Sequence, residues 1–394
     1  MKHLAVALDE LVTIVGGGTP SKARPEYFKG RIPWVSPKDM KSWHIVDSED
    51  HITEEAIESS STSLLRPGAV LVVIRSGILK HTLPVAINRV SVTLNQDMKG
   101  LLCGERVTPE YLARALQALS HKLLHTVRGT TADNIPTDVL RGLAIPLPPV
   151  AEQNRVAAIL ERADRLRRRR RYGLEMAEDL LPTAFDRLFG DPVVNPKRWK
   201  VVTVEEAGTV QLGRQRAPQY QTGIYRRAYM RVANVYEDRI DLSDVLSMDF
   251  DEDDFREYKL EYGDILLNEG QSTELVGRPA MWRNELPDCC FQNTLLRFQC
   301  NPNLCLPQFA LWLFIKYLHR GEFAKMSAKT SNVAHLGAYR LAQMPFPIPP
   351  LSVQGEFAAL VEKSGHLRAI VRESLRQAEH LFQTLLHRAF TGGL

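Results

Sequence analysis

Residues 145–153 read Ile-Pro-Leu-Pro-Pro-Val-Ala-Glu-Gln, and residues 346–354 read Phe-Pro-Ile-Pro-Pro-Leu-Ser-Val-Gln. Weaker matches precede and follow this repeated segment in the same order. Residues 34–36 align with 229–231, 66–71 with 261–266, and 96–97 with 292–293; each half closes with Leu-Leu and then Ala-Phe, at 180–185 and at 385–390. Matches in one order along the whole chain predict two copies of a unit of about 195 residues.

The first part of each copy has the pattern of a mixed α/β domain. Pro67-Gly68 is a turn ahead of the apolar run Ala69–Ile74, which predicts a buried strand. Apolar residues at helical spacing predict a helix over Tyr111–His125, and Phe309–Leu318 is its counterpart in the second copy.

The second part of each copy has the pattern of a long helix. Each proline pair, 148–149 and 349–350, cannot continue a helix but can precede one. Apolar residues then recur at intervals of three and four over several heptads, which is typical of a coiled coil. Pro182 is expected to end or kink the first long helix near its end.

We therefore predict an α/β (α+β) chain in four segments. Two similar globular domains, at 1–148 and 191–348, alternate with two long helices, at 149–190 and 349–394. The helices are expected to pair as an antiparallel coiled coil about a pseudo-twofold axis. The alternative is that each helix packs only on its own globular domain.

Composition narrows the class of protein. The chain has 394 residues, of which 44% are hydrophobic and 24% charged, values typical of a soluble globular protein. No run approaches the ~20 apolar residues of a membrane helix, and no apolar core follows Met1–Leu4, so we expect no signal peptide and a cytoplasmic location. The spacing of the five cysteines is not that of a zinc finger, so we expect buried free thiols.

Charge is segregated along the chain, although the net charge is only +4. Residues 111–132 and 207–236 contain no acid, and the second of these segments carries five arginines. Residues 237–257 then carry ten acids. This pattern favours a directed basic surface, as in proteins that bind nucleic acid; solvated loops of mixed sign are the alternative.

Catalytic motifs are lacking. Residues 16–22, Gly-Gly-Gly-Thr-Pro-Ser-Lys, do not have the spacing of a phosphate-binding loop, and the second copy keeps only Gly213 there. Neither GxSxG nor HExxH occurs, and Asp254, Glu257 and Lys259 resemble a nuclease set only faintly. We expect no catalytic residue and no metal site.

Several segments together resemble a known family. They are residues 16–21 (Gly-Gly-Gly-Thr-Pro-Ser), 32–39 (Ile-Pro-Trp-Val-Ser-Pro-Lys-Asp), 66–68 (Arg-Pro-Gly) ahead of a strand ending in 75–77 (Arg-Ser-Gly), and the proline-rich segment 146–153. The chain resembles the specificity (S) subunit of type I restriction–modification enzymes over essentially its whole length. The second copy departs from the family pattern at 212–214 (Leu-Gly-Arg) and at 353–354 (Val-Gln in place of Glu-Gln).

This resemblance implies a function. Residues 1–148 and 191–348 would be target recognition domains, each reading one half of a bipartite double-stranded DNA site. The helices would fix the spacing and dock two methyltransferase (M) subunits, which restriction (R) subunits join. The chain itself would be non-catalytic and bind no cofactor, whereas M would use S-adenosylmethionine and R would use ATP and Mg²⁺.

Base readout needs exposed side chains with paired donors or acceptors, and phosphate contacts need Lys and Arg. We chose candidates of these types after predicted strands and in the basic segments. The candidate DNA-binding residues are Ser36, Lys38, Arg75, Lys80, Arg128 and Thr130 in the first copy, and Arg214, Arg216, Arg226, Arg231, Asn234, Gln271, Arg278, Lys329 and Asn332 in the second.

Two rival interpretations remain open at this stage. One is a stand-alone tandem DNA-binding or scaffold protein, and the other is a nuclease or methyltransferase carrying such a scaffold. The run Arg167–Arg171 is predicted either to contact an M subunit or the DNA backbone, or to be the solvated face of a long helix.

Overall fold

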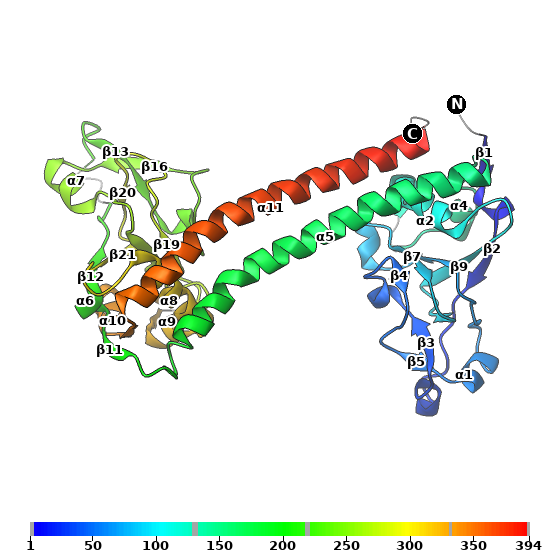
Figure 1. The fold of residues 1–394 in the computed structure, drawn as a ribbon, viewed down its shortest axis with the longest axis horizontal. Coiled ribbons are helices and arrows are strands. Elements are labelled where there is room, and N and C mark those ends of the chain that lie inside the picture. Colours follow the sequence, from blue (N-terminus) through cyan, green and yellow to red (C-terminus); the bar gives the residue numbers. More distant parts are fainter. Residues whose placement is uncertain (1–3, 128–132, 217–220, 331–332, 392–394) are drawn as a thin grey trace. The chain divides into compact units, whose positions relative to one another are not determined.

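The structure is a computed structural model that describes residues 4–127, 133–216, 221–330 and 333–391. The chain forms two compact units. Unit 1 combines Met1–Tyr172 with Glu373–Leu394, and unit 2 is Gly173–Arg372. Each unit contains one half of each of two long helices, α5 (Val150–Phe189) and α11 (Leu351–Thr391), green and red in Figure 1. We call residues 4–148 the first lobe and residues 191–348 the second lobe.

The first lobe is built on a five-stranded sheet in the order β2-β9-β6-β7-β4. Its central strand β6 is fully buried, which confirms the strand predicted after Pro67-Gly68. A three-stranded sheet, β5-β3-β8, and the short pair β1–β10 complete the lobe. The strands are β1 (Ala5–Ala7), β2 (Val12–Gly16), β3 (Ile32–Val35), β4 (His44–Ile45), β5 (His51–Ile52), β6 (Val70–Val73), β7 (Val85–Asn88), β8 (Thr93–Leu94), β9 (Met98–Cys103) and β10 (Ala144–Pro146).

Helices of the first lobe are short. The predicted helix over 111–125 is present as two consecutive helices, and the core lies between them, the main sheet and the start of α5. The helices are α1 (Glu54–Glu58), α2 (Pro109–Ala118), α3 (Ser120–Val127) and α4 (Thr137–Arg141), with the 3-10 turns η1 (Leu8–Glu10), η2 (Pro25–Phe28), η3 (Pro37–Asp39) and η4 (Gly77–Lys80).

The second lobe repeats this plan. Its main sheet has the order β12-β21-β17-β19, and the other sheets are β16-β13-β20, β18-β23-β22, β14-β15 and β11-β24. The strands are β11 (Lys200–Thr203), β12 (Gly208–Leu212), β13 (Arg226–Met230), β14 (Val235–Tyr236), β15 (Arg239–Ile240), β16 (Leu246–Asp249), β17 (Ile265–Asn268), β18 (Gly270–Gln271), β19 (Pro279–Met281), β20 (Cys290–Phe291), β21 (Leu295–Cys300), β22 (Ala328–Thr330), β23 (Val333–His335) and β24 (Pro345–Ile348). The helices are α6 (Val204–Ala207), α7 (Glu252–Tyr258), α8 (Pro307–His319), α9 (Glu322–Met326) and α10 (Ala338–Ala342), and η6 is Val232–Asn234.

The repeated proline-rich segment has the same structural role in both units. Gln153, fully buried, accepts a hydrogen bond from the Thr108 amide (2.9 Å) and donates to the carbonyls of Arg106 and Pro148. Gln354 does the same with the Leu306 amide (2.8 Å) and the carbonyls of Leu304 and Pro349. Each glutamine therefore ties the start of a long helix to the loop that leads into α2 or α8. A buried amide with every polar atom satisfied explains why the motif ends in Gln.

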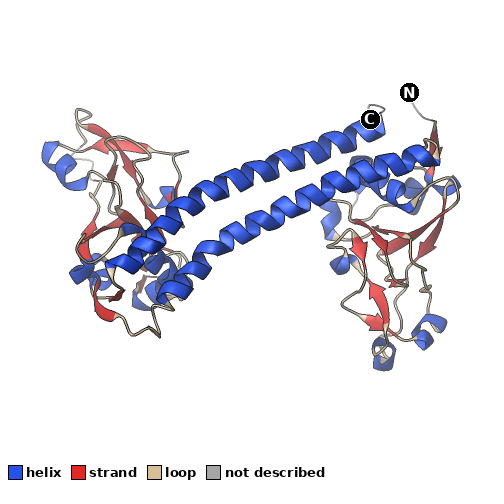
Figure 2. Cartoon of the chain, viewed as in Figure 1, coloured by secondary structure: helices blue, strands red, loops and turns tan. Residues whose placement is uncertain are grey.

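The long helices run antiparallel within each unit. In unit 1 Arg171 pairs with Glu379 (2.9 Å), and the Arg167 guanidinium lies 4.3 Å from the Phe382 ring centre, three residues further along α11. In unit 2 Phe185 packs edge-to-face on Phe357. Both helices also contribute to the lobe cores, and Pro182 does not end α5. Figure 2 shows each helix as continuous. The predicted mixed α/β fold with paired long helices is confirmed.

Three further properties concern the described residues. No helix among them is long and apolar enough to cross a membrane. All five cysteines are free, and burial raises the pKa of Cys103, Cys289 and Cys290 to about 12. In the part of the chain that the structure describes, no three His, Cys, Asp or Glu side chains are grouped as a metal site requires.

Candidate nucleic-acid interface

The first group of candidates lies where β6 ends. The amide of Arg75 bonds to the Asp97 carbonyl (3.2 Å), and Arg75 forms a bridge with Asn134. Lys80 ends the turn η4 that follows. The Arg75 and Lys80 side chains are more than half exposed, and both reach carboxylates: Arg75 Nε lies 2.5 Å from Asp97, and Lys80 Nζ lies 3.3 Å from Asp133.

The second lobe has a three-stranded sheet at the equivalent place. The bridge between Arg75 and Asn134 corresponds to the pairing of Gly270 with His335 between β18 and β23. Gln271 and Lys329 both pair with Ala334, from opposite sides of β23. The backbone thus brings these two candidates to one register position. Arg278, half-buried, lies against the Tyr236 ring (4.6 Å).

A second group of candidates lies at the turns that follow β3 and β13. Ser36 is buried and bonds to Asp39 (2.9 Å), which caps η3. Asn234 is also buried; it accepts a hydrogen bond from the Arg231 amide (3.1 Å), which closes the equivalent turn η6, and it donates to the carbonyls of Asp241 and Asp244. The sequence analysis did not predict that the Ser36 and Asn234 side chains would form hydrogen bonds within their own turns. Lys38, more exposed, pairs with Asp50 (2.8 Å) and Glu49 (3.2 Å).

Glycines allow the 16–18 loop of the first lobe to pack closely against β3 and the end of β8. The 16–18 loop crosses the end of β8 so closely that a Cβ on Gly17 would lie 1.7 Å from the Asn95 carbonyl oxygen. Trp34, at the end of β3, donates its indole N–H to the Gly18 carbonyl (3.0 Å). The Gly-rich turn is therefore required by close backbone packing, and it does not have the spacing of a phosphate-binding loop. Gly213 approaches the Gln292 carbonyl in the same way in the second lobe.

The basic segment of the second lobe is lined by carboxylates. Arg214 pairs with Asp254 of α7 (2.8 Å), Arg231 pairs with Asp244, and Arg226 donates to Ser247 (3.2 Å). Arg216 is exposed. Sequence reasoning missed these carboxylates as partners, although the acidic run 237–257 was the signal for them. Arg128, Thr130 and Asn332 lie outside the described residues, and for Lys329 only the backbone position is described.

The arginine run on α5 is divided between two roles. Asp164, buried, accepts from Arg167 (2.6 Å) and Arg168 (3.2 Å), and Arg171 pairs with Glu379 on α11. Arg169 and Arg170 are exposed. Three of the five side chains therefore stabilise unit 1 internally, and two face solvent.

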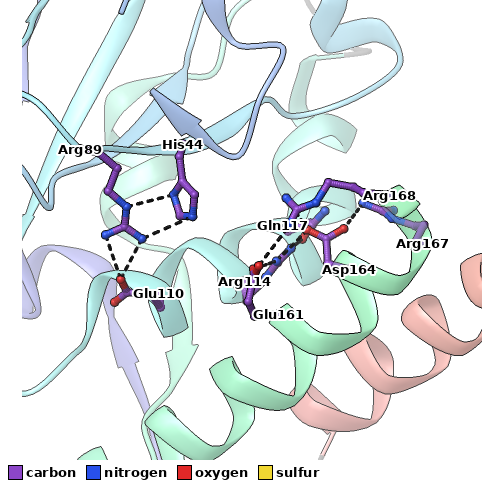
Figure 3. Close-up of polar contacts among 9 residues, drawn as sticks. All are labelled: His44, Arg89, Glu110, Arg114, Gln117, Glu161, Asp164, Arg167 and Arg168. Carbon is purple, nitrogen blue, oxygen red and sulfur yellow. Dashed lines mark hydrogen bonds and ion pairs between the residues drawn. The ribbon is translucent and has the colours of Figure 1, made fainter. Parts of the chain in front are cut away.

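The same cluster joins the first lobe to α5 through a buried arginine of α2 (Figure 3). Arg114 donates to Asp164 (2.9 Å) and Glu161 (3.2 Å), and its guanidinium lies 3.6 Å from the Trp43 ring centre. Burial raises the pKa of Asp164, but the surrounding guanidinium groups outweigh burial and the net shift is downward. Beside this cluster Arg89 contacts both His44 (3.1 Å) and Glu110 (3.3 Å). We call Arg114 and its partners the polar joint.

Unit 2 has an apolar joint at the corresponding place. Trp312 is the sixth residue of α8, as Arg114 is of α2, and it packs edge-to-face on Phe357 of α11 (5.9 Å). Phe357 in turn contacts Phe185 and Phe189 of α5. Gly365 takes the place that Asp164 has eleven residues after the buried glutamine. The lobe is therefore held to its helices by aromatic rings packed edge to face.

Comparison with known proteins gives sequence matches over part of the chain. Residues 5–175 match the family model of the type I restriction modification DNA specificity domain. A stretch of 162 residues, 40% of this chain, is 39% identical to the type I restriction enzyme EcoR124I/EcoR124II specificity subunit of Escherichia coli. A stretch of 232 residues, 54% of the chain, is 28% identical to the type I restriction enzyme MjaIX specificity subunit of Methanocaldococcus jannaschii. The matched stretches span 40% and 52% of those two relatives.

Solved structures share the fold over the whole chain. The type I restriction–modification system S subunit from M. genitalium has a TM-score of 0.58, with 98% of this chain and 95% of that chain covered at 14% identity. A chain from a study of complex assembly and conformational transition of the type I system has a TM-score of 0.57, with 99% and 98% covered at 19% identity. These likenesses concern the fold alone. Together with the sequence matches, they confirm the predicted resemblance to specificity subunits of type I restriction–modification enzymes.

Proposed function

We propose that this chain is the DNA sequence-recognition subunit of a type I restriction–modification complex. The first lobe and the second lobe act as target recognition domains, and each reads one part of a bipartite double-stranded site. The observation that carries the proposal is that one lobe architecture occurs twice, each time tied by a buried glutamine to a long helix. Two readers on one chain suit a split target.

The candidates at the strand ends are proposed as the DNA contacts. Arg75 and Lys80 come after β6 in the first lobe; in the second lobe Gln271 comes after β17, and Lys329 of β22 pairs with the same residue of β23 as Gln271 does. Arginine, lysine and glutamine can make paired hydrogen bonds to base edges or contact phosphates. The arginines of the basic segment 207–236 extend this surface in the second lobe.

Partners complete the proposal. The paired helices act as the spacer and dock two methyltransferase subunits, which use S-adenosylmethionine; restriction subunits, which use ATP and Mg²⁺, join that core. Exposed Arg169 and Arg170 are available for a subunit or for the DNA backbone. The chain performs no catalysis of its own in this scheme and acts in the cytoplasm.

Mapping DNA methylation in the host with and without this chain tests the proposal. We expect one split motif, two short specific parts around a fixed gap, to lose its methylation when the chain is removed. The purified chain alone should neither methylate nor cleave DNA in the presence of S-adenosylmethionine and Mg²⁺. Unchanged methylation, or modification by the chain alone, would favour a stand-alone scaffold or a catalytic chain instead.

A further inference from the structure

Most of the candidate DNA-contacting cations with described side chains lie against a carboxylate of their own lobe. In the first lobe Lys38, Arg75 and Lys80 each have an acidic partner within 3.3 Å. In the second lobe Arg214 and Arg231 have theirs. A surface built to attract phosphates would be expected to carry uncompensated cations. Here the local charge is close to balanced.

The carboxylate of the first lobe is held in place from within. Asp97 Oδ1 takes the Arg75 side chain, and Oδ2 accepts a hydrogen bond from the buried Asn95 (3.2 Å). The Asp97 amide bonds back to Asn95 Oδ1 (3.1 Å), and the Asp97 carbonyl accepts from the Ile74 amide (2.8 Å). Asp97 is thus fixed by the fold, whereas Arg75 is half exposed. Any phosphate that approaches Arg75 must compete with an anion that does not move away.

The second lobe achieves the same balance with a helix. Asp251 caps α7, so Asp254 is held in its first turn, where it meets Arg214; both side chains are mostly covered. Phe255 of α7 lies under the Arg227 guanidinium (4.4 Å). In Figure 1, α7 lies beside β20, whose parallel partner is β13. The acidic helix therefore covers part of the basic segment.

Stability does not explain the exposed pairs of the first lobe. Exposed ion pairs contribute little to the free energy of unfolding, so the two pairs at the end of β6 would do little for the fold. Their effect on DNA binding is larger, because sequence-independent affinity comes from phosphate neutralisation. A cation already neutralised releases fewer DNA counterions. A base edge that offers a good paired contact can still compete, because it supplies geometry as well as charge.

We propose that Asp97, Asp133 and Asp254 are specificity-determining residues that suppress sequence-independent DNA binding by occupying Arg75, Lys80 and Arg214. The inference rests on the proposed DNA-recognition function and adds a role for residues that do not themselves contact DNA. Each carboxylate withholds its cation from passing phosphates. The affinity for the correct site then rises relative to the affinity for all other sequences.

The test compares two duplexes across a salt series. One carries the site mapped from methylation and the other is a scrambled duplex of the same composition; the full chain is used alone and with its co-purified methyltransferase subunit. The variant Asp97→Asn/Asp133→Asn keeps the side-chain shapes. We expect its affinity for the scrambled duplex to rise about two- to fivefold per carboxylate, and the log–log salt slope to steepen by about one for each freed cation. Affinity for the site should rise less, so the ratio between duplexes falls.

A matched control separates a local effect from one of net charge. Asp9→Asn/Glu10→Gln removes two exposed carboxylates of η1 in the same lobe and changes the charge equally. Equal behaviour of the two double variants would overturn the proposal. Loss of binding to the site alone would also overturn it, because Asp97 or Asp133 would then read bases directly. If the unmodified protein does not distinguish the duplexes, the proposed function itself fails, and that result is visible before any variant is made.

Discussion

The polar joint of unit 1 and the apolar joint of unit 2 hold corresponding helices together by different physics. In unit 1 a buried guanidinium is satisfied by Asp164 and Glu161 and stacked on Trp43. In unit 2 the corresponding position of α8 carries Trp312, which packs on Phe357 within a cluster of buried apolar side chains. One backbone plan therefore accepts either solution, provided that each buried polar group finds partners. The difference predicts that the two units respond differently to mutation and to pH.

The largest effect is expected from Trp312→Ala. It removes a large buried ring from the aromatic cluster and should lower the stability of unit 2 by about 3–5 kcal/mol. Hydrogen exchange measured by mass spectrometry would show lost protection in α8 and in residues 351–372, with unit 1 unchanged. Tyr339→Ala, at a mostly exposed position of the same unit, is the control and should have little effect.

Trp312→Phe sharpens the same comparison. The Trp312 indole N–H is buried and has no hydrogen-bond partner among the described residues. Trp312→Phe should therefore lower the stability of unit 2 much less than Trp312→Ala does. A loss as large as that of Trp312→Ala would mean that the indole N–H has a partner and that the joint is not apolar.

An effect of similar size, but more diagnostic of the polar joint, is expected from Asp164→Asn. The change removes Asp164 as the acidic partner of Arg167 and leaves Arg114 and Arg168 with Glu161, and breaking a buried ion pair costs about 3 kcal/mol or more. Unit 1 should lose protection against exchange while unit 2 keeps it. Asp264→Asn is the matched change in unit 2, because that carboxylate is equally buried but lies 3.4 Å from the Arg297 guanidinium.

The pH profiles of these two aspartates should have opposite signs. The folded-state pKa of Asp164 is lowered, so its contribution is complete above the ordinary value of about 4 and is lost as pH falls through the lower folded-state pKa. Burial raises the pKa of Asp264 despite Arg297, so protonation there favours the folded state as pH falls. Acid unfolding followed by exchange should therefore begin in unit 1. Parallel acid unfolding of both units in the wild type would contradict this assignment.

The smallest effect is expected from Arg171→Ala. The Arg171–Glu379 pair is half exposed, so its loss should cost about 0.5 kcal/mol or less, and salt should weaken it further. Thermal unfolding at low and at high salt measures the loss of stability and its dependence on salt. The corresponding pair of unit 2, between Arg372 and Glu178, should behave alike, and Arg372→Ala is the matched variant. A loss above 1 kcal/mol would show that the surface pairs matter as much as the joints.

The repeat, the long helices and the buried strand at 70–73 could be predicted because each depends on a local pattern of prolines and apolar spacing. The polar joint could not be predicted, because Arg114, Trp43 and Asp164 lie far apart in the sequence and none belongs to a local motif. The candidate site was predictable as a set of cations after strands. The carboxylate partners of these cations could not be predicted, because the pairing of Asp97 with Arg75 and of Asp254 with Arg214 depends on how the turns fold. Ser36 and Asn234 show the same difficulty, because a turn-capping side chain and a base-reading side chain are of the same chemical type.

The composition of unit 1 has a consequence for how the protein is made. Phe382 and Leu386, near the end of the chain, fill the core of a lobe whose strands come from its beginning. During synthesis, all segments that form the core of the second lobe are therefore made before the last segment of the first lobe's core. We expect a nascent chain stalled before residue 373 to show a folded second lobe and an unfinished first one. During synthesis, the second lobe should then become resistant to protease before the first lobe, although the first lobe is translated earlier.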